Sequence, residues 1–195
     1  MLDFGCGAGR VLPHVARLAP AAVCAGCDVD RMAVEWAAAH RPGLAWAVSS
    51  FEPPLPYPDE AFDLIYSISV FSHLGSGLQL RWLRELRRIL APGGLALLSV
   101  HGQHAFEQFR SGRVRTAWCP PEVFARPPLE ATDFVFAPYV RSSWTMGDLP
   151  GIGQEYGLSF QGPDYARQTW AAELEVLDIL EHALTGWQDI VICVK

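Results

Sequence analysis

This chain of 195 residues begins with "MLDFGCGAG" (residues 1–9), and the fold class can be inferred outward from these residues. Its apolar start is typical of a buried strand, and the helical pattern "RVLPHVARLA" (10–19) follows directly after its three glycines. Glycine at a strand-to-helix turn permits positive φ and lets a ligand lie against bare backbone, where a Cβ would collide. The stretch therefore predicts a strand, a ligand-holding turn and a helix.

The spacing of the glycines indicates what the turn holds. Gly5, Gly7 and Gly9 form the pattern G-x-G-x-G, whereas dinucleotide-binding sheets use G-x-G-x-x-G and would need a glycine in place of Arg10. An acid at the end of the strand, Asp3, suits an ammonium group and suits a pyrophosphate poorly. A nucleotide-dependent oxidoreductase is therefore the weaker interpretation of this turn.

A second acid follows the next apolar stretch. Asp28 closes that stretch, where a carboxylate can accept hydrogen bonds from the two hydroxyls of a ribose. Asp30 competes for this role, but its place at the start of a helical pattern favours an N-cap. Together, Asp3, the glycine turn and Asp28 predict a site for a nucleoside that carries an amino-acid tail.

Apolar runs alternate with helical patterns through the first hundred residues. Such alternation predicts an α/β fold: a Rossmann-like, doubly wound, mostly parallel sheet in three α/β/α layers. We expect Ser76 to cap the third helix and residues 92–94 to end it. The expected strands are 1–4, 21–29, 44–48, 62–70 and 95–100, the expected helices are 10–19, 30–40 and 77–90, and 174–180 with 187–195 form an antiparallel C-terminal hairpin.

The same patterns predict one domain over residues 1–195. Residues 1–102 form its cofactor-binding half, 103–170 an aromatic and proline-rich substrate or lid region, and 171–195 its C-terminal strands. Weak periodicity in the middle region allows no assignment of its elements.

Composition limits the classes of partner. Half of the residues are apolar, 18% are charged, and the formal net charge is −6, which argues against a general nucleic-acid surface. The basic run 81–88 has helical spacing and is interpreted as the solvated face of a helix. Five cysteines form no disulfide framework, and Cys24 and Cys27 are expected to be core residues, so a cytoplasmic location is expected. Neither a signal peptide nor a membrane span is predicted.

In its motifs the chain resembles the class I S-adenosylmethionine-dependent methyltransferases of the type 11/12-like branch. The resemblance runs to about residue 102 and resumes at the C-terminal tail. It implies methyl transfer from S-adenosylmethionine to a small-molecule or glycan-type acceptor, on oxygen or nitrogen, by in-line displacement. Family members generally have a further segment before the first strand, and a cofactor-binding protein without catalysis is the alternative. The matching stretches are "LDFGCGAGR", "CDVD", "PPLPYPDEAFDLIYSISVFSHL", "ELRRILAPGGLALLSVHG" and "WQDIVICVK".

The resemblance also implies cofactor-binding roles for residues that follow the first four strands. At the adenine-edge position the family often carries an acid, and this chain has Ser50 there. The implied roles are Asp3 near the ammonium group, Gly5, Cys6 and Gly7 along the methionine moiety, Asp28 on the ribose, Val29 and Phe51 beside the adenine with Ser50, and Ser67 and Ser69 along the methyl donor.

The sequence indicates less about the residues that bind the acceptor. His73 follows the fourth expected strand and could take a proton from a hydroxyl acceptor, although a helix-start or packing histidine is the alternative. His101, Trp118 and Trp144 are candidates for binding the acceptor, and core filling is the alternative for each tryptophan. No ligand spacing suggests a metal, and we expect a monomer or homodimer without nucleic-acid partners or membrane insertion.

Overall fold

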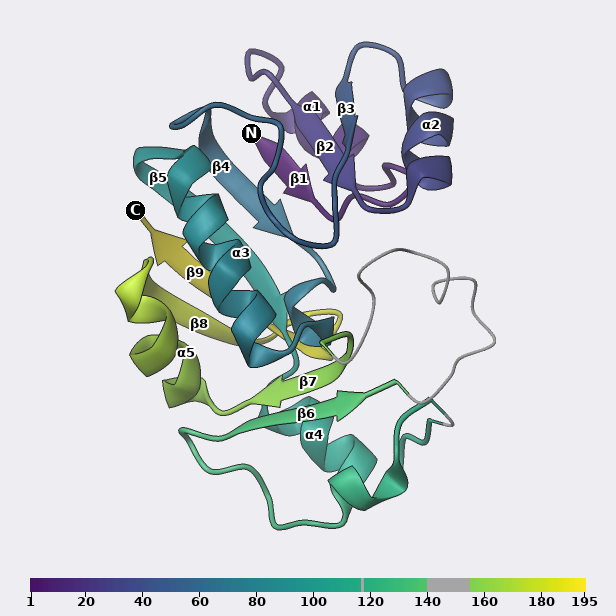
Figure 1. Ribbon diagram of the computed structural model, residues 1–195, viewed down its shortest axis with the longest axis vertical. Coiled ribbons are helices and arrows are strands. Elements are labelled where there is room, and N and C mark those ends of the chain that lie inside the picture. Colours follow the sequence, from purple (N-terminus) through teal and green to yellow (C-terminus); the bar gives the residue numbers. More distant parts are fainter. Residues whose placement is uncertain (117, 140–154) are drawn as a thin grey trace.

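The computed structural model describes residues 1–116, 118–139 and 155–195. Its main element is a seven-stranded sheet in the order β3-β2-β1-β4-β5-β9-β8 (Figure 1). All neighbouring strands pair in parallel except β9, which is antiparallel to β5 and to β8. The strands are β1 (Leu2–Phe4), β2 (Ala25–Asp28), β3 (Ala45–Val48), β4 (Phe62–Ser67), β5 (Leu90–Val100), β8 (Glu175–Leu184) and β9 (Gln188–Val194).

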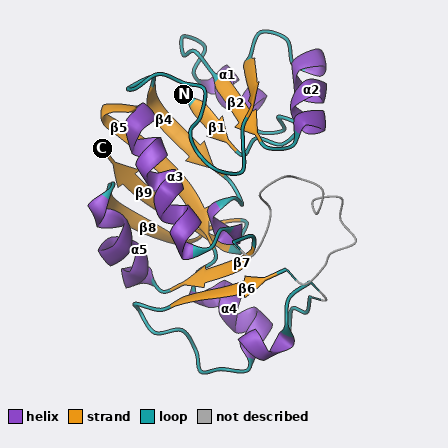
Figure 2. Ribbon diagram, viewed as in Figure 1, coloured by secondary structure: helices purple, strands orange, loops and turns teal. Residues whose placement is uncertain are grey.

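Helices cover both faces of this sheet (Figure 2). On one face, Leu83 and Leu86 of α3 share a core with Leu2 and Phe4 of β1. On the other face, Leu12 of α1 packs with residues of the sheet. These layers confirm the predicted three-layer, mostly parallel fold with an antiparallel C-terminal strand. The helices are α1 (Leu12–Leu18), α2 (Arg31–His40), α3 (Ser76–Ile89), α4 (Gln103–Arg110) and α5 (Pro163–Thr169).

A second, two-stranded sheet lies beyond the carboxyl ends of β4 and β5 (Figure 1). It pairs β6 (Phe134–Pro138) with β7 (Gly157–Gln161) in antiparallel register, and α4 packs beside it. The core of this unit holds Phe106 and Phe160. None of these elements was assigned from the sequence, and they place β7 directly over the edge of the main sheet where parallel α/β folds bind ligands.

Two predicted boundaries of the third helix are wrong. The helix begins at Ser76 with Gly75 in the cap position, so Ser76 forms no side-chain cap. It ends at Ile89, and residues 92–94 lie inside β5, opposite a shift in the register between β4 and β5. A strand can absorb proline and glycine at such an irregularity, because the ladder is already interrupted there. The Asp30 cap of α2 is confirmed, since its carboxylate accepts from the Ala33 N–H at 3.1 Å.

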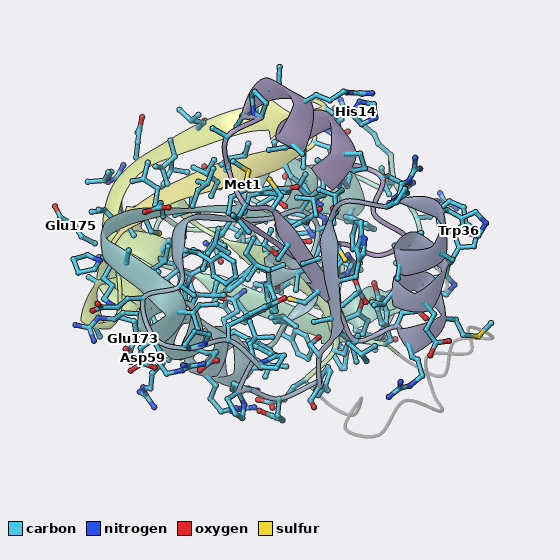
Figure 3. All side chains as sticks on the ribbon, turned by 90° about the horizontal axis from the view of Figure 1, so that it is seen from above. Met1, His14, Trp36, Asp59, Glu173 and Glu175 are labelled. Atoms are coloured by element: carbon cyan, nitrogen blue, oxygen red, sulfur yellow. The ribbon has the colours of Figure 1, made fainter. Side chains whose placement is uncertain are left out.

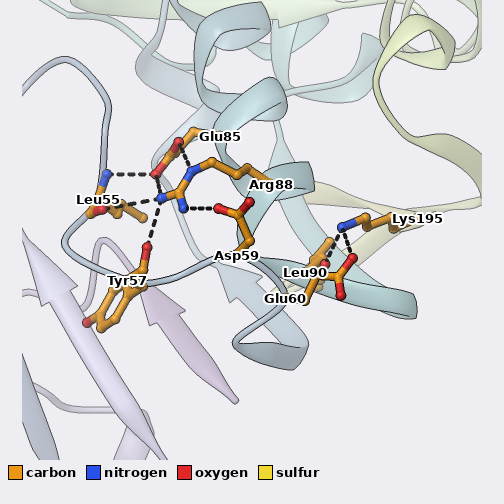
Figure 4. Close-up of polar contacts among 8 residues, drawn as sticks. All are labelled: Leu55, Tyr57, Asp59, Glu60, Glu85, Arg88, Leu90 and Lys195. Atoms are coloured by element: carbon orange, nitrogen blue, oxygen red, sulfur yellow. Dashed lines mark hydrogen bonds and ion pairs between the residues drawn. The ribbon is translucent and has the colours of Figure 1, made fainter.

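The basic run of α3 is solvated only in part. Arg88 pairs with Glu85 and donates to the Tyr57 carbonyl at 2.9 Å, while Glu85 accepts from the Leu55 N–H at 2.7 Å (Figure 4). Arg88 also reaches Asp59 at 2.7 Å. The pair therefore fastens the proline-rich loop before β4 to the helix, which the helical spacing alone did not predict.

The outer helices carry exposed residues that lie away from the site. Figure 3 shows His14 of α1 and Trp36 of α2 at the periphery of the molecule, and the Trp36 ring stacks on His40 at 4.3 Å. All five cysteines are free and buried, as expected for Cys24 and Cys27. Among the described residues, no helix is long and apolar enough to cross a membrane.

Candidate active site

The glycine turn connects β1 to α1 and is anchored on the neighbouring strand β2. The Cys27 carbonyl accepts hydrogen bonds from the N–H groups of Gly5 and Cys6, at 2.8 and 3.0 Å. All three glycines have positive φ, +81° at Gly5, +51° at Gly7 and +67° at Gly9. This backbone explains why the turn requires glycine, because other residues adopt positive φ only at a cost in strain.

The three glycines differ in the space that a side chain would find at their positions. A Cβ on Gly5 would lie 2.1 Å from a methyl group of Val70, and one on Gly9 would lie 2.3 Å from the Trp46 ring. At Gly7 no atom lies within 4 Å of the Cβ position. Packing therefore accounts for the first and third glycines, whereas only Gly7 leaves open space in which a ligand can approach the backbone.

Asp3 is a buried carboxyl beneath this turn, with 3% of its surface exposed. Burial raises its pKa to about 7, the Tyr66 hydroxyl beside it opposes the shift, and the charge on Asp28 adds to it. Among the described residues Asp3 forms no ion pair. A buried carboxyl that lacks a cation fits the ammonium group that the resemblance places there.

Asp28 ends β2 and holds the turn in place. One of its carboxylate oxygens accepts from the Gly7 N–H at 2.7 Å, and the other accepts from the Asp30 N–H at 2.8 Å. Each oxygen retains a second lone pair, so the half-buried carboxylate can also accept from two ribose hydroxyls. The residues present therefore fit both ends of S-adenosylmethionine.

The residues expected beside the adenine lie next to Asp28. Val29 follows it and is half-buried, and Ser50 is exposed after β3. The Phe51 ring meets the Tyr156 ring edge-on, with centroids 6.3 Å apart. This contact brings Tyr156, from the segment before β7, to the residues expected beside the adenine, and burial, with the charge on Asp28, raises its pKa to about 12.

The two serines expected along the methyl donor differ in their surroundings. Ser67, at the end of β4, is buried, and its hydroxyl has no hydrogen-bond partner among the described residues. Ser69 has φ +59° and donates its N–H to the Ser99 hydroxyl at 2.7 Å. The chain turns sharply at Ser69, which directs Val70 onto the glycine turn and the next residues away from it.

His73 stands at the end of this turn, half-buried beneath β7. Its Nδ1 lies 2.8 Å from the Gly157 carbonyl and 3.0 Å from the Tyr139 hydroxyl. A carbonyl only accepts, so this contact assigns the proton to Nδ1 and the lone pair to Nε2. Burial lowers the pKa of His73, and the Gly157 carbonyl opposes that shift, so the ring is neutral at pH 7.

His101 follows β5, and its ring, like that of His73, contacts a backbone carbonyl of β7. Its Nδ1 lies 3.2 Å from the Ser159 carbonyl, which leaves Nε2 to accept from the Gln188 amide at 3.4 Å. Gln188 also exchanges hydrogen bonds with Ser69 at 3.0 and 3.2 Å. Burial, with the neighbouring His73, lowers the pKa of His101 to about 3. His101 is thus a buried, satisfied group, in contrast to His73.

A pocket of about 530 Å³ opens beside the two histidines. Its lining brings His73, His101 and Trp118 together, whereas Trp144 falls outside the described residues. No group of three or more metal-ligating side chains is placed to hold an ion in the described ranges. From the sequence, Tyr139 and Tyr156 were placed only in the substrate or lid region as a whole, and neither Trp187 nor Gln188, which also line this pocket, was singled out.

Comparison with known proteins agrees with this geometry. A family model described as "Methyltransferase domain" matches residues 2–98. The ajmaline N-methyltransferase of Rauvolfia serpentina is 34% identical over 107 residues, which are 52% of this chain and 35% of that protein. The "Probable tRNA methyltransferase 9B" of Homo sapiens is 33% identical over 99 residues, 50% of this chain and 20% of that protein.

Among solved structures, an S-adenosylmethionine-dependent methyltransferase of Methanosarcina mazei shares the fold. It aligns with a TM-score of 0.64 at 18% identity, over 100% of this chain and 91% of that chain. The matched stretches span about a third of the length of two of these curated relatives, so substrates and partners do not follow from them. The family-model match over residues 2–98, the glycine turn and the strand order together show that the chain belongs to the class I S-adenosylmethionine-dependent methyltransferase family.

Proposed function

We propose that this protein transfers a methyl group from S-adenosylmethionine to an oxygen or nitrogen of a small-molecule or glycan-type acceptor, with His73 as the general base. One observation carries the proposal. The loop after β4 packs Val70 against Gly5 of the glycine turn, at a distance that only glycine allows, and three residues later presents His73 to a pocket. A methyl donor on the turn and an acceptor in the pocket would therefore be neighbours.

The residues of the turn hold the donor in this proposal. Asp3 faces the ammonium group, the backbone of Gly5 to Gly7 lies along the methionine moiety, and Asp28 accepts from the ribose hydroxyls. Bound there, the cofactor supplies a methyl group on a positively charged sulfur: the acceptor atom bonds to the methyl carbon, and the carbon–sulfur bond breaks with its electron pair left on sulfur. The leaving group is good, so the protein contributes mainly orientation and exclusion of water.

His73 removes the proton that a hydroxyl acceptor must lose. Its Nδ1–H is fixed on the Gly157 carbonyl, so the neutral ring offers the Nε2 lone pair to that proton. Because burial lowers the pKa of His73 below its usual value of 6.5, the ring is a base throughout the neutral range. The rate on a hydroxyl acceptor is therefore expected to be flat between pH 7 and 8 and to fall only in acid.

Replacement of His73 tests the proposal. On a hydroxyl acceptor found by screening with methyl-labelled S-adenosylmethionine, His73→Ala is expected to lower kcat about 10²- to 10⁴-fold. Cofactor affinity is expected to stay within about twofold, because His73 lies outside the turn. His40→Ala, on the outer face of α2, is the matched control and is expected to retain full activity. Normal turnover by His73→Ala would remove His73 as the base, and cofactor binding without transfer to any acceptor would favour a binding protein.

A further inference from the structure

The pocket beside His73 is lined in part by aromatic rings. Four rings line it, as two adjoining pairs: Phe109 with Trp187, whose centroids are 5.9 Å apart, and Trp118 with Tyr139, whose centroids are 6.2 Å apart. The first pair comes from α4 and the turn before β9, and the second from the segments around β6. Its volume of about 530 Å³ lies within the range of pockets that bind drug-sized ligands.

The wall formed by Phe109 and Trp187 is held by packing on both sides. Phe109 stacks on Phe124 with centroids 5.0 Å apart and planes at 14°. The centroid of the Trp187 ring lies 6.0 Å from that of His101, and the backbone N–H of Trp187 donates to the Leu184 carbonyl at 3.0 Å. These rings are therefore fixed before a ligand arrives, which lowers the entropy cost of stacking a flat molecule against them.

Two of the polar side chains in the lining lie away from the histidines or have a partner: Arg115 is exposed to solvent, and the Thr116 hydroxyl accepts from the backbone N–H of Trp118 at 3.1 Å. Contacts with Gln188 and Ser159 already occupy both nitrogens of His101, and Gln188 bonds to Ser69 as well. The Nε2 atom of His73 has no hydrogen-bond partner within the described ranges. A sugar carries hydroxyls around its ring, and each one buried without a partner costs about 1–3 kcal/mol. Beside His73 the lining therefore offers ring surfaces and one nitrogen that can accept a hydrogen bond, which suits a flat aromatic body with one hydroxyl better than a glycan.

We propose that the pocket binds a planar aromatic compound whose ring lies against Phe109 and Trp187 and whose hydroxyl donates a hydrogen bond to Nε2 of His73. This inference rests on the proposed function, since it narrows the acceptor of the same site to an aromatic alcohol. The low pKa of His73 agrees with it, because a weak base is better matched to a phenolic hydroxyl, with a pKa of about 10, than to an aliphatic one.

Binding of three probes, without cofactor, tests the inference by calorimetry on the whole chain. The probes are 2-naphthol, naphthalene, which lacks the hydroxyl, and methyl β-glucoside, which lacks the aromatic ring. We expect 2-naphthol to bind, naphthalene to bind about fivefold more weakly because one hydrogen bond is lost, and the glucoside not to bind measurably. Glucoside binding as tight as that of 2-naphthol would overturn the inference.

Two variants locate the binding. Trp187→Leu is expected to lower the affinity for 2-naphthol about tenfold. Trp36→Leu, which replaces an exposed ring on α2, is expected to leave that affinity unchanged. His73→Phe is expected to bring 2-naphthol and naphthalene to the same affinity. Equal loss in both tryptophan variants, or a hydroxyl preference that survives His73→Phe, would contradict the inference.

A separate titration with S-adenosylmethionine distinguishes this inference from the proposed function. If the cofactor binds and a methyl group reaches another acceptor while 2-naphthol does not bind, the aromatic assignment fails and the proposed function stands. If 2-naphthol binds as described and the cofactor does not, the proposed function fails and the pocket assignment stands. Circular dichroism and thermal unfolding of each variant show whether it has kept its fold.

Discussion

Asp3→Asn is expected to stabilise the free protein at pH 8 and to weaken its binding of S-adenosylmethionine. Burial raises the pKa of Asp3 to about 7 in the folded chain, above the value of about 3.9 for an exposed aspartate. The folded state therefore favours the protonated carboxyl, and the stability that this group contributes is lost as the pH rises through 7. An asparagine carries no charge to bury and can still accept a hydrogen bond.

The stabilisation is expected to be on the order of a few kcal/mol at pH 8, measured by urea unfolding. It should be small at pH 4, grow toward pH 7 and level off above. Cofactor affinity is expected to fall at least about tenfold in the variant, because the ammonium group loses its counter-charge. Asp63→Asn, on the exposed side of β4, is the control and should change neither quantity. A variant that is less stable at pH 8, or that binds the cofactor normally, would refute the role assigned to Asp3.

Gly7→Ala is expected to abolish cofactor binding at a modest cost in stability. Gly7 has φ +51° and open space at its Cβ position, so the added methyl group meets no atom of the protein. It would stand where a ligand approaches the backbone beside Asp28. The backbone strain of an alanine at positive φ is about 1–2 kcal/mol.

Gly43→Ala provides a matched control for this variant. Gly43 has φ +85° and equally open surroundings, but it lies in the loop between α2 and β3. Both variants should lose similar stability in thermal unfolding, and only Gly7→Ala should lose binding of S-adenosylmethionine by calorimetry. Equal affinity in the two variants would show that the open space at Gly7 holds no part of the cofactor.

The sequence predicted the sheet and its helices because their residues follow simple periods. Strands such as 62–70 are apolar runs with glycine, proline or a helix cap nearby, and the structure places Phe62–Ser67 there. The antiparallel hairpin was also predicted, since its connection is too short for a crossover. The error at residues 92–94 has a physical cause, because whether glycine and proline end a helix or interrupt a ladder depends on the partner strand.

The acceptor region could not be predicted in the same way. The proton of His73 is assigned by the carbonyl of Gly157, which is 84 residues away in the chain. Gln188 reaches Ser69 across 119 residues. Such contacts form only in the folded chain, once β7 and β9 are packed at the site. The residues of these two strands do not indicate which segments they will contact. The cofactor-binding half could be predicted because the glycine turn and its two acids, Asp3 and Asp28, lie within the first 28 residues.

In the proposed function, the glycine turn binds S-adenosylmethionine through Asp3 and Asp28. Calorimetric titration of the unmodified protein at pH 8 with S-adenosylmethionine, S-adenosylhomocysteine and NAD tests it most directly. We predict one site that binds both adenosyl compounds and does not bind NAD. The affinity for S-adenosylmethionine should fall as the pH is lowered, because Asp3 becomes protonated. Binding of NAD alone would show that the turn holds a dinucleotide, and an S-adenosylmethionine affinity that does not change between pH 6 and 8 would show that Asp3 is not the partner of its ammonium group.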